Sequence, residues 1–302
     1  MLLVCTLFVG ILLIPDCANA WGPISHLAHG AEILKETTTL GMGLQQLLAR
    51  HHYAYLYGCV GADITLAKKF TRRIQAHCHS WHVGWQVLAA ARTEIECAFA
   101  YGYLTHLAAD VFSHNHFVPT QLILSFRTRT LRHIYWEARF DGMQEAEYRT
   151  VLRRLRRHAF PECDDLMKRV VARTVFPFRT NKQIFDSVLA FHDWDNWHRL
   201  MQQVVSRSRY ALPAGLAPRY NVLCLSAARD VLTRGKNASC QSADPTGLAA
   251  LTLAKDVRRK LKLLDRRGAI TPEIEQQLEM LNQRQELEAE PGVVPDIAHA
   301  LG

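Results

Sequence analysis

The stretch HLAADVFSHNHF, residues 106–117, combines an apolar composition with side chains of the kinds that bind metal ions. At 3.6 residues per turn, positions four apart differ by only about 40° around a helix axis. His106, Asp110 and His114 are spaced in this way, so a helix places all three along one face. This spacing favours a helix, and it makes the shared face a candidate metal site.

Helical spacing of apolar residues recurs along the chain, whereas the period-two alternation of strands is nearly absent. The apolar content of 49% and the charged content of 21% are typical of a folded globular protein. The sequence therefore predicts an all-α, multi-helix bundle. Expected helices cover 24–38, 86–112 (as two helices, or as one loosened near Gly102), 130–143, 164–176, 181–212, 246–268 and 271–290, and expected loops cover 213–221 and 234–247.

The first twenty residues have the pattern of an export signal. An apolar run, Leu2–Pro15, precedes small residues at Ala18 and Ala20, the two positions that a signal peptidase reads, although no Lys or Arg comes before the run. We expect cleavage after Ala20 and a periplasmic or secreted product without a transmembrane helix. The expected organisation is a signal peptide at 1–20, a metal-binding helical catalytic domain at 21–150 and a helical C-terminal region at 151–302, either separate or continuous with that domain.

The net charge of +8 comes largely from basic runs such as VLRRLRRH and DVRRKLKLLDRR. Such runs favour polyanions, including phosphodiester substrates and acidic membrane surfaces, but they are more often solvated helix faces. Six of the eight cysteines lie beyond the expected cleavage point, and one sequence leaves their pairing open.

Histidines are concentrated in one part of the chain, since 11 of the 15 lie between His26 and His133. His133 and Glu137 repeat the four-residue spacing, and zinc binds imidazole nitrogen and carboxylate oxygen that converge from facing helices. Asp63 follows a glycine at an expected helix end, where its carboxylate can point inward, and the run HCHSWH adds His77, His79 and His82. Together these residues predict a metal cluster.

Trp21 becomes the first residue of the chain if cleavage follows Ala20. A free α-amine has a pKa near 7.7–8.0, so it can lose its proton and bind a metal ion. The backbone nitrogen of Trp21 is therefore a further candidate ligand.

This combination of residues resembles the bacterial zinc-dependent phospholipase C family and, more distantly, the trinuclear-zinc nucleases specific for single strands. The resemblance covers about residues 21–141, and WGPISH is similar to the family's mature start. It implies an all-α enzyme with up to three zinc ions, held by one Trp, five His, two Asp and one Glu. The implied ligands are Trp21, His26, Asp63, His79, His106, Asp110, His133 and Glu137, with one more histidine from the run SHNHF.

Two of the histidine assignments have competitors. His79 is favoured over His77 in HCHSWH. Family spacing selects His116 as the histidine that follows Asp110, whereas helical geometry selects His114 without any distortion of the helix. We favour His114 and keep His116 as the alternative.

The resemblance implies zinc-dependent hydrolysis of a phosphodiester. By resemblance, Asp110 would bridge two metal ions and Asp63 would orient or deprotonate the attacking water. Phospholipase C-type cleavage of phospholipids, with contact to a membrane surface, is favoured over a nuclease acting on single-stranded nucleic acid. A non-catalytic, metal-stabilised protein is the third hypothesis. The run HDWDNWH, 192–198, offers further groups that could contact metal or substrate, but we favour its interpretation as a helix cap or surface turn.

Overall fold

The computed structural model of the chain describes residues 21–65, 77–128, 133–171, 176–195 and 212–287, together with 197, 199, 201, 203, 208 and 210. Every regular element within these residues is helical, which confirms the predicted all-α class. The expected signal peptide lies outside the described residues. Within the described part, no helix combines the length and the apolar character needed to cross a bilayer.

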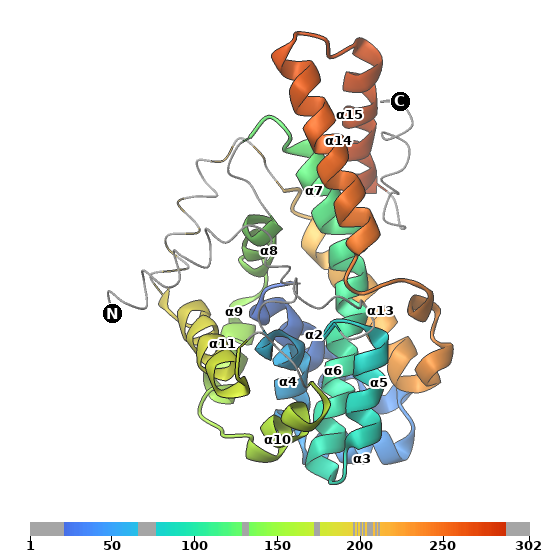
Figure 1. Cartoon of the computed structure of the whole chain (residues 1–302). Coiled ribbons are helices and arrows are strands. Elements are labelled where there is room, and N and C mark those ends of the chain that lie inside the picture. The colour runs from blue at the N-terminus through green and yellow to red at the C-terminus, as the bar shows by residue number, and fades with distance from the viewer. Residues whose placement is uncertain are drawn as a thin grey trace.

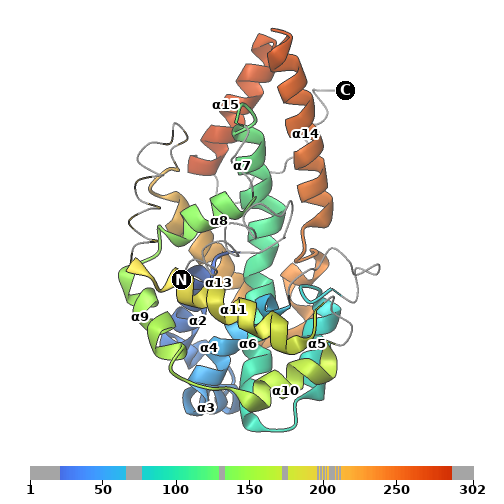
Figure 2. The same ribbon diagram turned by 60° about the vertical axis from the view of Figure 1, so that its left-hand side comes forward.

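Helices of the N-terminal part surround one long central helix (Figures 1 and 2). The central helix is α6 (Glu94–Phe112). The helices around it are α2 (Pro23–Lys35), α3 (Met42–Arg50), α4 (His52–Gly61) with the short turn η2 (Ala62–Ile64), and α5 (Trp81–Ala90). A π-turn, η5 (Ser113–Phe117), joins α6 to α7 (Val118–Leu124).

The remaining helices cover this core or project from it (Figure 1). They are α8 (His133–Asp141), α9 (Ala146–Leu155), α10 (Pro161–Val170), α11 (Phe178–His192), α13 (Leu216–Arg234), α14 (Leu248–Arg266) and α15 (Pro272–Leu287), with short 3-10 turns at Thr37–Thr39, Gly235–Asn237 and Ser239–Ser242. The expected helix at 181–212 is interrupted, because α11 ends at His192 and residues 193–194 are not helical, whereas the described residues 195, 197, 199, 201 and 203 are helical again.

The closest packing in the core is between α4 and α6, and glycines make it possible. A Cβ added at Gly102 would lie 2.0 Å from the backbone oxygen of Tyr55, and one added at Gly58 would lie 2.0 Å from that of Phe99. The two backbones therefore touch, and the hydroxyl groups of Tyr55 and Thr105 are hydrogen-bonded at 3.0 Å beside the contact. The alternative prediction of one helix loosened near Gly102 is wrong, because α6 is continuous through that residue.

The break in the expected 86–112 helix occurs instead before Thr93. The Thr93 hydroxyl accepts a hydrogen bond from the backbone N–H of Glu96 at 3.2 Å, which caps the first turn of α6. In the same way, Ser80 caps α5 by accepting from Val83 at 3.2 Å. Capping residues thus decide where both helices begin.

The expected loop at 213–221 is wrong, because α13 begins at Leu216. Leu216, Ala217 and Tyr220 are buried in the core, and Pro218 lies in the first turn, where a missing N–H costs nothing. Helix α13 then packs against α6 in the centre of the molecule.

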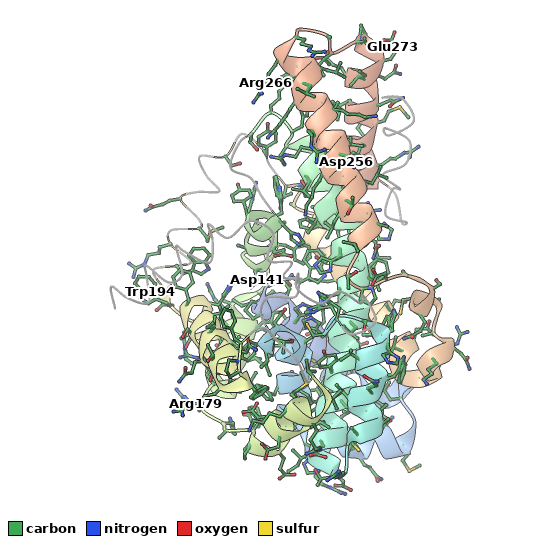
Figure 3. The ribbon with its side chains drawn as sticks, in the orientation of Figure 1. Asp141, Arg179, Trp194, Asp256, Arg266 and Glu273 are labelled. Carbon is green, nitrogen blue, oxygen red and sulfur yellow. The ribbon has the colours of Figure 1, made fainter. Side chains whose placement is uncertain are left out.

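Helices α14 and α15 form a hairpin that extends away from the core, with Asp256 midway along it and Arg266 and Glu273 near its far end (Figure 3). The hairpin packs against α7. Arg258 fastens it there, since its guanidinium donates to the backbone oxygens of Leu122 at 2.9 Å and Thr128 at 3.0 Å. Cations are favourable at the carbonyl end of a helix, so this contact stabilises the end of α7.

Gly102→Ala should force α4 and α6 apart, and we expect it to destabilise the fold by about 1–3 kcal/mol through overpacking. Gly43→Ala is the matched control, because Gly43 lies in α3 with no atom within 4 Å of its added Cβ. Helix propensity should make the control neutral or stabilising by up to about 1 kcal/mol. Thermal unfolding followed by circular dichroism measures both, and equal melting temperatures would contradict the close contact.

Candidate metal centre

Asp110 lies at the centre of the candidate site, and its carboxylate has no exposed surface. Its Oδ1 is 3.3 Å from Nε2 of His26, which comes from α2. Its Oδ2 is 3.1 Å from Nε2 of His106 and 3.3 Å from Nε2 of His79. The four-residue spacing of His106 and Asp110 thus places both side chains on one face of α6, as predicted.

Asp63 extends this group from the end of α4. Its Oδ1 is 3.3 Å from Nε2 of His79, and its side chain is 18% exposed, whereas those of His79 and Asp110 are at most 1% exposed. His26, Asp63 and His106 offer ligand atoms that all lie within 4.8 Å of one another. Asp63 is therefore the member of this group that solvent reaches.

A second group adjoins the first. His114, His133 and Glu137 also offer ligand atoms within 4.8 Å of one another. Oε1 of Glu137 is 2.5 Å from Nε2 of His133 and 3.8 Å from that of His114. The ring centres of His79 and His114 are 6.5 Å apart, so both groups belong to one cluster.

The donors in this cluster fit zinc. Both carboxylate oxygens of Asp110, Oε1 of Glu137 and Nε2 of His26 are buried without a hydrogen-bond partner among the described residues. Buried polar atoms are normally paired, so several unpaired ones facing one another call for a shared cation. Imidazole nitrogen and carboxylate oxygen are ligands that zinc takes in proteins.

Burial also affects the pKa values of the cluster. It lowers the pKa of His26 and raises the pKa of Glu137 well above its usual range. Burial alone would raise the pKa of Asp110 too, but His106 and the other imidazoles hold that pKa well below its usual range. An ionised Glu137 at neutral pH therefore needs a positive charge beside it.

Hydrogen bonds at the far side of two rings leave Nε2 available for a metal ion. Nδ1 of His106 donates to the backbone oxygen of Cys59 at 2.8 Å, and Nδ1 of His114 donates to that of Pro245 at 2.7 Å. Because a carbonyl oxygen only accepts, Nδ1 carries the proton and Nε2 of the neutral ring has a free lone pair. This arrangement is typical of metal-bound histidine.

A comparison with protein families finds a match to the model for zinc-dependent phospholipase C over residues 23–209, well over half of the chain. The chain belongs to the zinc-dependent phospholipase C family. The resemblance noted from the sequence is thereby confirmed, and the dependence on zinc agrees with the donor set. No curated protein and no solved structure gives a significant match.

In this family member, the structure separates the two pairs of competing histidines. His116 is outside the groups found among the described residues, its ring centre is 5.9 Å from that of Phe112, and burial lowers its pKa to about 4. His77 forms a group only with Cys78 and His79. The geometry therefore favours His114 and His79 as ligands, although both assignments stay predictions.

The helix is distorted where His114 lies, contrary to the expectation that it would not be. Ser113–Phe117 forms a π-turn, which accommodates one extra residue within the helix. Such turns are frequent at functional sites. His114 lies on this turn, with its Nε2 3.8 Å from Oε1 of Glu137.

Trp21 lies beside the cluster at the start of the described chain. Its indole Nε1 donates to the backbone oxygen of Ala109 at 3.1 Å, and its ring centre is 3.7 Å from that of Phe140. The buried indole thus fixes the first described residue next to Asp110. Metal binding by the Trp21 amine stays a prediction.

Sequence reasoning missed Asp141, which holds the first turn of α2 from the end of α8 (Figure 3). Its carboxylate accepts from the backbone N–H groups of Ile24 at 3.1 Å and Ser25 at 2.8 Å, and from the Ser25 hydroxyl at 2.7 Å. A Cβ at Gly22 would lie 2.3 Å from Cγ of Asp141. Nδ1 of His192 lies 3.3 Å from Oδ2, so α11 meets the same carboxylate. The sequence signal was that α2 begins at Gly-Pro without a capping side chain of its own.

Asp141→Ala should remove this cap, and we expect a loss of about 1–2 kcal/mol in the free energy of unfolding. Asp141→Asn keeps one acceptor oxygen and should lose less, which makes it the graded control. Chemical denaturation of both variants provides the measurement. A wild-type stability for Asp141→Ala would show that the carboxylate contributes nothing to α2.

His114→Ala should lower the zinc content of the purified protein, because it removes one donor from the second group. His116→Ala, two residues away on the same π-turn, should leave the zinc content unchanged. Elemental analysis after extensive dialysis compares the two. The assignment is reversed if only the His116 variant loses zinc.

Proposed function

We propose that this protein is an exported zinc-dependent phosphodiester hydrolase that cleaves phospholipids in the manner of a phospholipase C. The family match supports phospholipid as the substrate class. The observation that carries the proposal is the buried cluster of imidazoles and carboxylates with the partly exposed Asp63 at its edge. The leader-like pattern at 1–20 supports export, to the periplasm or outside the cell.

Most residues of the cluster would bind the metal ions, and Asp63 would act on the proton of the attacking water. His26, His79, His106 and Asp110 would hold one part of the centre, and His114, His133 and Glu137 the other. Up to three zinc ions fit the donor set that the family resemblance implies. Zinc bound there would supply Lewis-acid chemistry, stabilising charge on the phosphoryl oxygens and favouring the ionisation of water near neutral pH.

Asp63 is the best-placed carboxylate to act on the attacking water. It faces the cluster through His79 and is also partly open to solvent. A carboxylate held beside a nucleophile can orient it and accept its proton, which typically contributes about 10²–10⁴ in rate. We therefore assign this positioning or general-base role to Asp63.

Contact with an anionic membrane surface would bring the substrate to the site. The exposed side of α14 carries Arg259 and Lys260, and Arg266 lies near the end of the projecting hairpin. Basic helix faces attract anionic lipid headgroups. The same charges would also attract nucleic acid, so the substrate assay has to include both.

The test is release of phosphorylated headgroups from vesicles of phosphatidylcholine and phosphatidylethanolamine, with and without an anionic lipid such as phosphatidylglycerol, with release of nucleotides from single-stranded DNA measured in parallel. We expect headgroup release by the zinc-loaded protein, and a loss of about 10²–10⁴ in kcat for Asp63→Asn. Asp110→Ala should lose zinc and activity together. Asp165→Asn is the matched control, since this exposed residue of α10 pairs only with Lys168 among the described residues.

Each other outcome assigns a different function. Nucleotide release without headgroup release would identify a nuclease. Bound zinc without turnover of either substrate would identify a metal-stabilised, non-catalytic protein. Full activity in a fully metallated Asp110→Ala variant would refute the proposed centre.

A further inference from the structure

The turn that precedes α14 contacts the π-turn on which His114 lies. The backbone oxygen of Pro245 accepts from Nδ1 of His114 at 2.7 Å. The side-chain amide of the next residue, Asn115, donates to the backbone oxygen of Asp244 at 2.8 Å. Two successive residues of the π-turn are thus held by two successive residues of a segment about 130 positions further along the chain.

This turn is stabilised by its own hydrogen bonds. The Asp244 carboxylate accepts from the backbone N–H of Thr246 at 3.0 Å and from the Thr246 hydroxyl. The N–H of Gly247 donates to the backbone oxygen of Asp244 at 2.9 Å, and the oxygen of Gly247 accepts from Leu251 at 2.8 Å as α14 begins. The Pro245 carbonyl is therefore presented from a defined turn and not from a loose connection.

Gly247 is in contact with His114 itself. Its φ of +56° is in the left-handed region that favours glycine. A Cβ added there would lie 2.4 Å from both Cβ and the backbone oxygen of His114. The turn thus packs against the backbone of His114 through Gly247, while the Pro245 carbonyl accepts a hydrogen bond from the His114 ring.

We propose that the turn 243–247 is a positioning element of the metal centre. It holds His114 with Nδ1 protonated, and it fixes the direction in which Nε2 points toward Glu137. The family match ends at residue 209, so this chain completes the centre with a segment from beyond the matched region. The inference rests on the proposed function only in taking His114 as a zinc ligand.

The physical basis is the coupling between the two nitrogens of an imidazole ring. The hydrogen bond at Nδ1 sets the tautomer and the orientation of the lone pair at Nε2. Losing such an outer partner typically costs about 10–100-fold in metal affinity. A turn that served only to pack α14 would leave that affinity unchanged.

Gly247→Ala and Gly268→Ala form the matched pair for the test. Both glycines have positive φ, +56° and +65°, so both substitutions strain the backbone in the same way. Only Gly247→Ala inserts a Cβ against His114, because an added Cβ at Gly268 has no atom within 4 Å. A difference between the two variants therefore reports the contact with His114.

Zinc affinity is measured by competition with a chromogenic chelator, and the visible spectrum of the cobalt-substituted protein reports ligand geometry. We expect Gly247→Ala to bind its weakest zinc about 10–100-fold less tightly and to have an altered cobalt spectrum. Gly268→Ala should match the wild type in both. Asp244→Ala loosens the turn without inserting an atom, so a loss of affinity there supports the proposal even if Gly247→Ala does not fold, and Asp244→Asn should restore part of it.

Wild-type zinc affinity and cobalt spectrum in both Gly247→Ala and Asp244→Ala would overturn the proposal, as would an equal loss in Gly268→Ala. These measurements use no phospholipid. A protein whose zinc affinity depends on the turn but which cleaves no lipid would refute the proposed function and leave this inference standing.

Discussion

The contact between the Asp110 carboxylate and three buried imidazoles is the constraint on which the rest of the molecule depends. An isolated charge in a core is costly unless it is paired, and Asp110 lies in the middle of a core made by α2, α4 and α6. Its partners come from α2, from the residues before α5 and from α6 itself. Three separate parts of the chain must therefore be in place before this carboxylate can be buried.

The same constraint explains why the backbones of α4 and α6 touch. The glycine contact between the two helices brings the carbonyl of Cys59 within 2.8 Å of Nδ1 of His106. Asp63 follows directly after α4, so the position of that helix also sets the position of the exposed carboxylate. A wider separation would move both away from Asp110. Packing and metal-site geometry are thus determined by one interface.

Much of this could be predicted from the sequence, because helical spacing is a local property. His106 with Asp110, and His133 with Glu137, share helix faces simply because they are four residues apart. The all-α class followed from the same periodicity. The pairing of the six cysteines beyond residue 20 does not follow from the sequence, and no disulfide joins them within the described residues.

The rest depended on tertiary contacts that leave no local signal. Every residue has a backbone carbonyl, so nothing in the sequence marks those of Cys59 and Pro245 as partners of imidazoles. Gly215 and Pro218 usually indicate a turn, so the sequence did not predict the start of α13. The helix forms there because it buries Tyr220 in the core. The Ala109 carbonyl is a further example, since the Trp21 indole and, at 3.8 Å, the Cys224 thiol both donate to it, one from before it in the sequence and one from after it.

The depth of the cluster has a kinetic consequence. An ion held by side chains as deeply buried as Asp110 and His106 can exchange with solvent only as fast as the surrounding helices open locally. Asp63 leaves one side accessible, but it is a single donor among several. We therefore expect a chelator that is strong enough to compete for the metal to remove it at the rate of that local opening, and a still stronger chelator to remove it no faster.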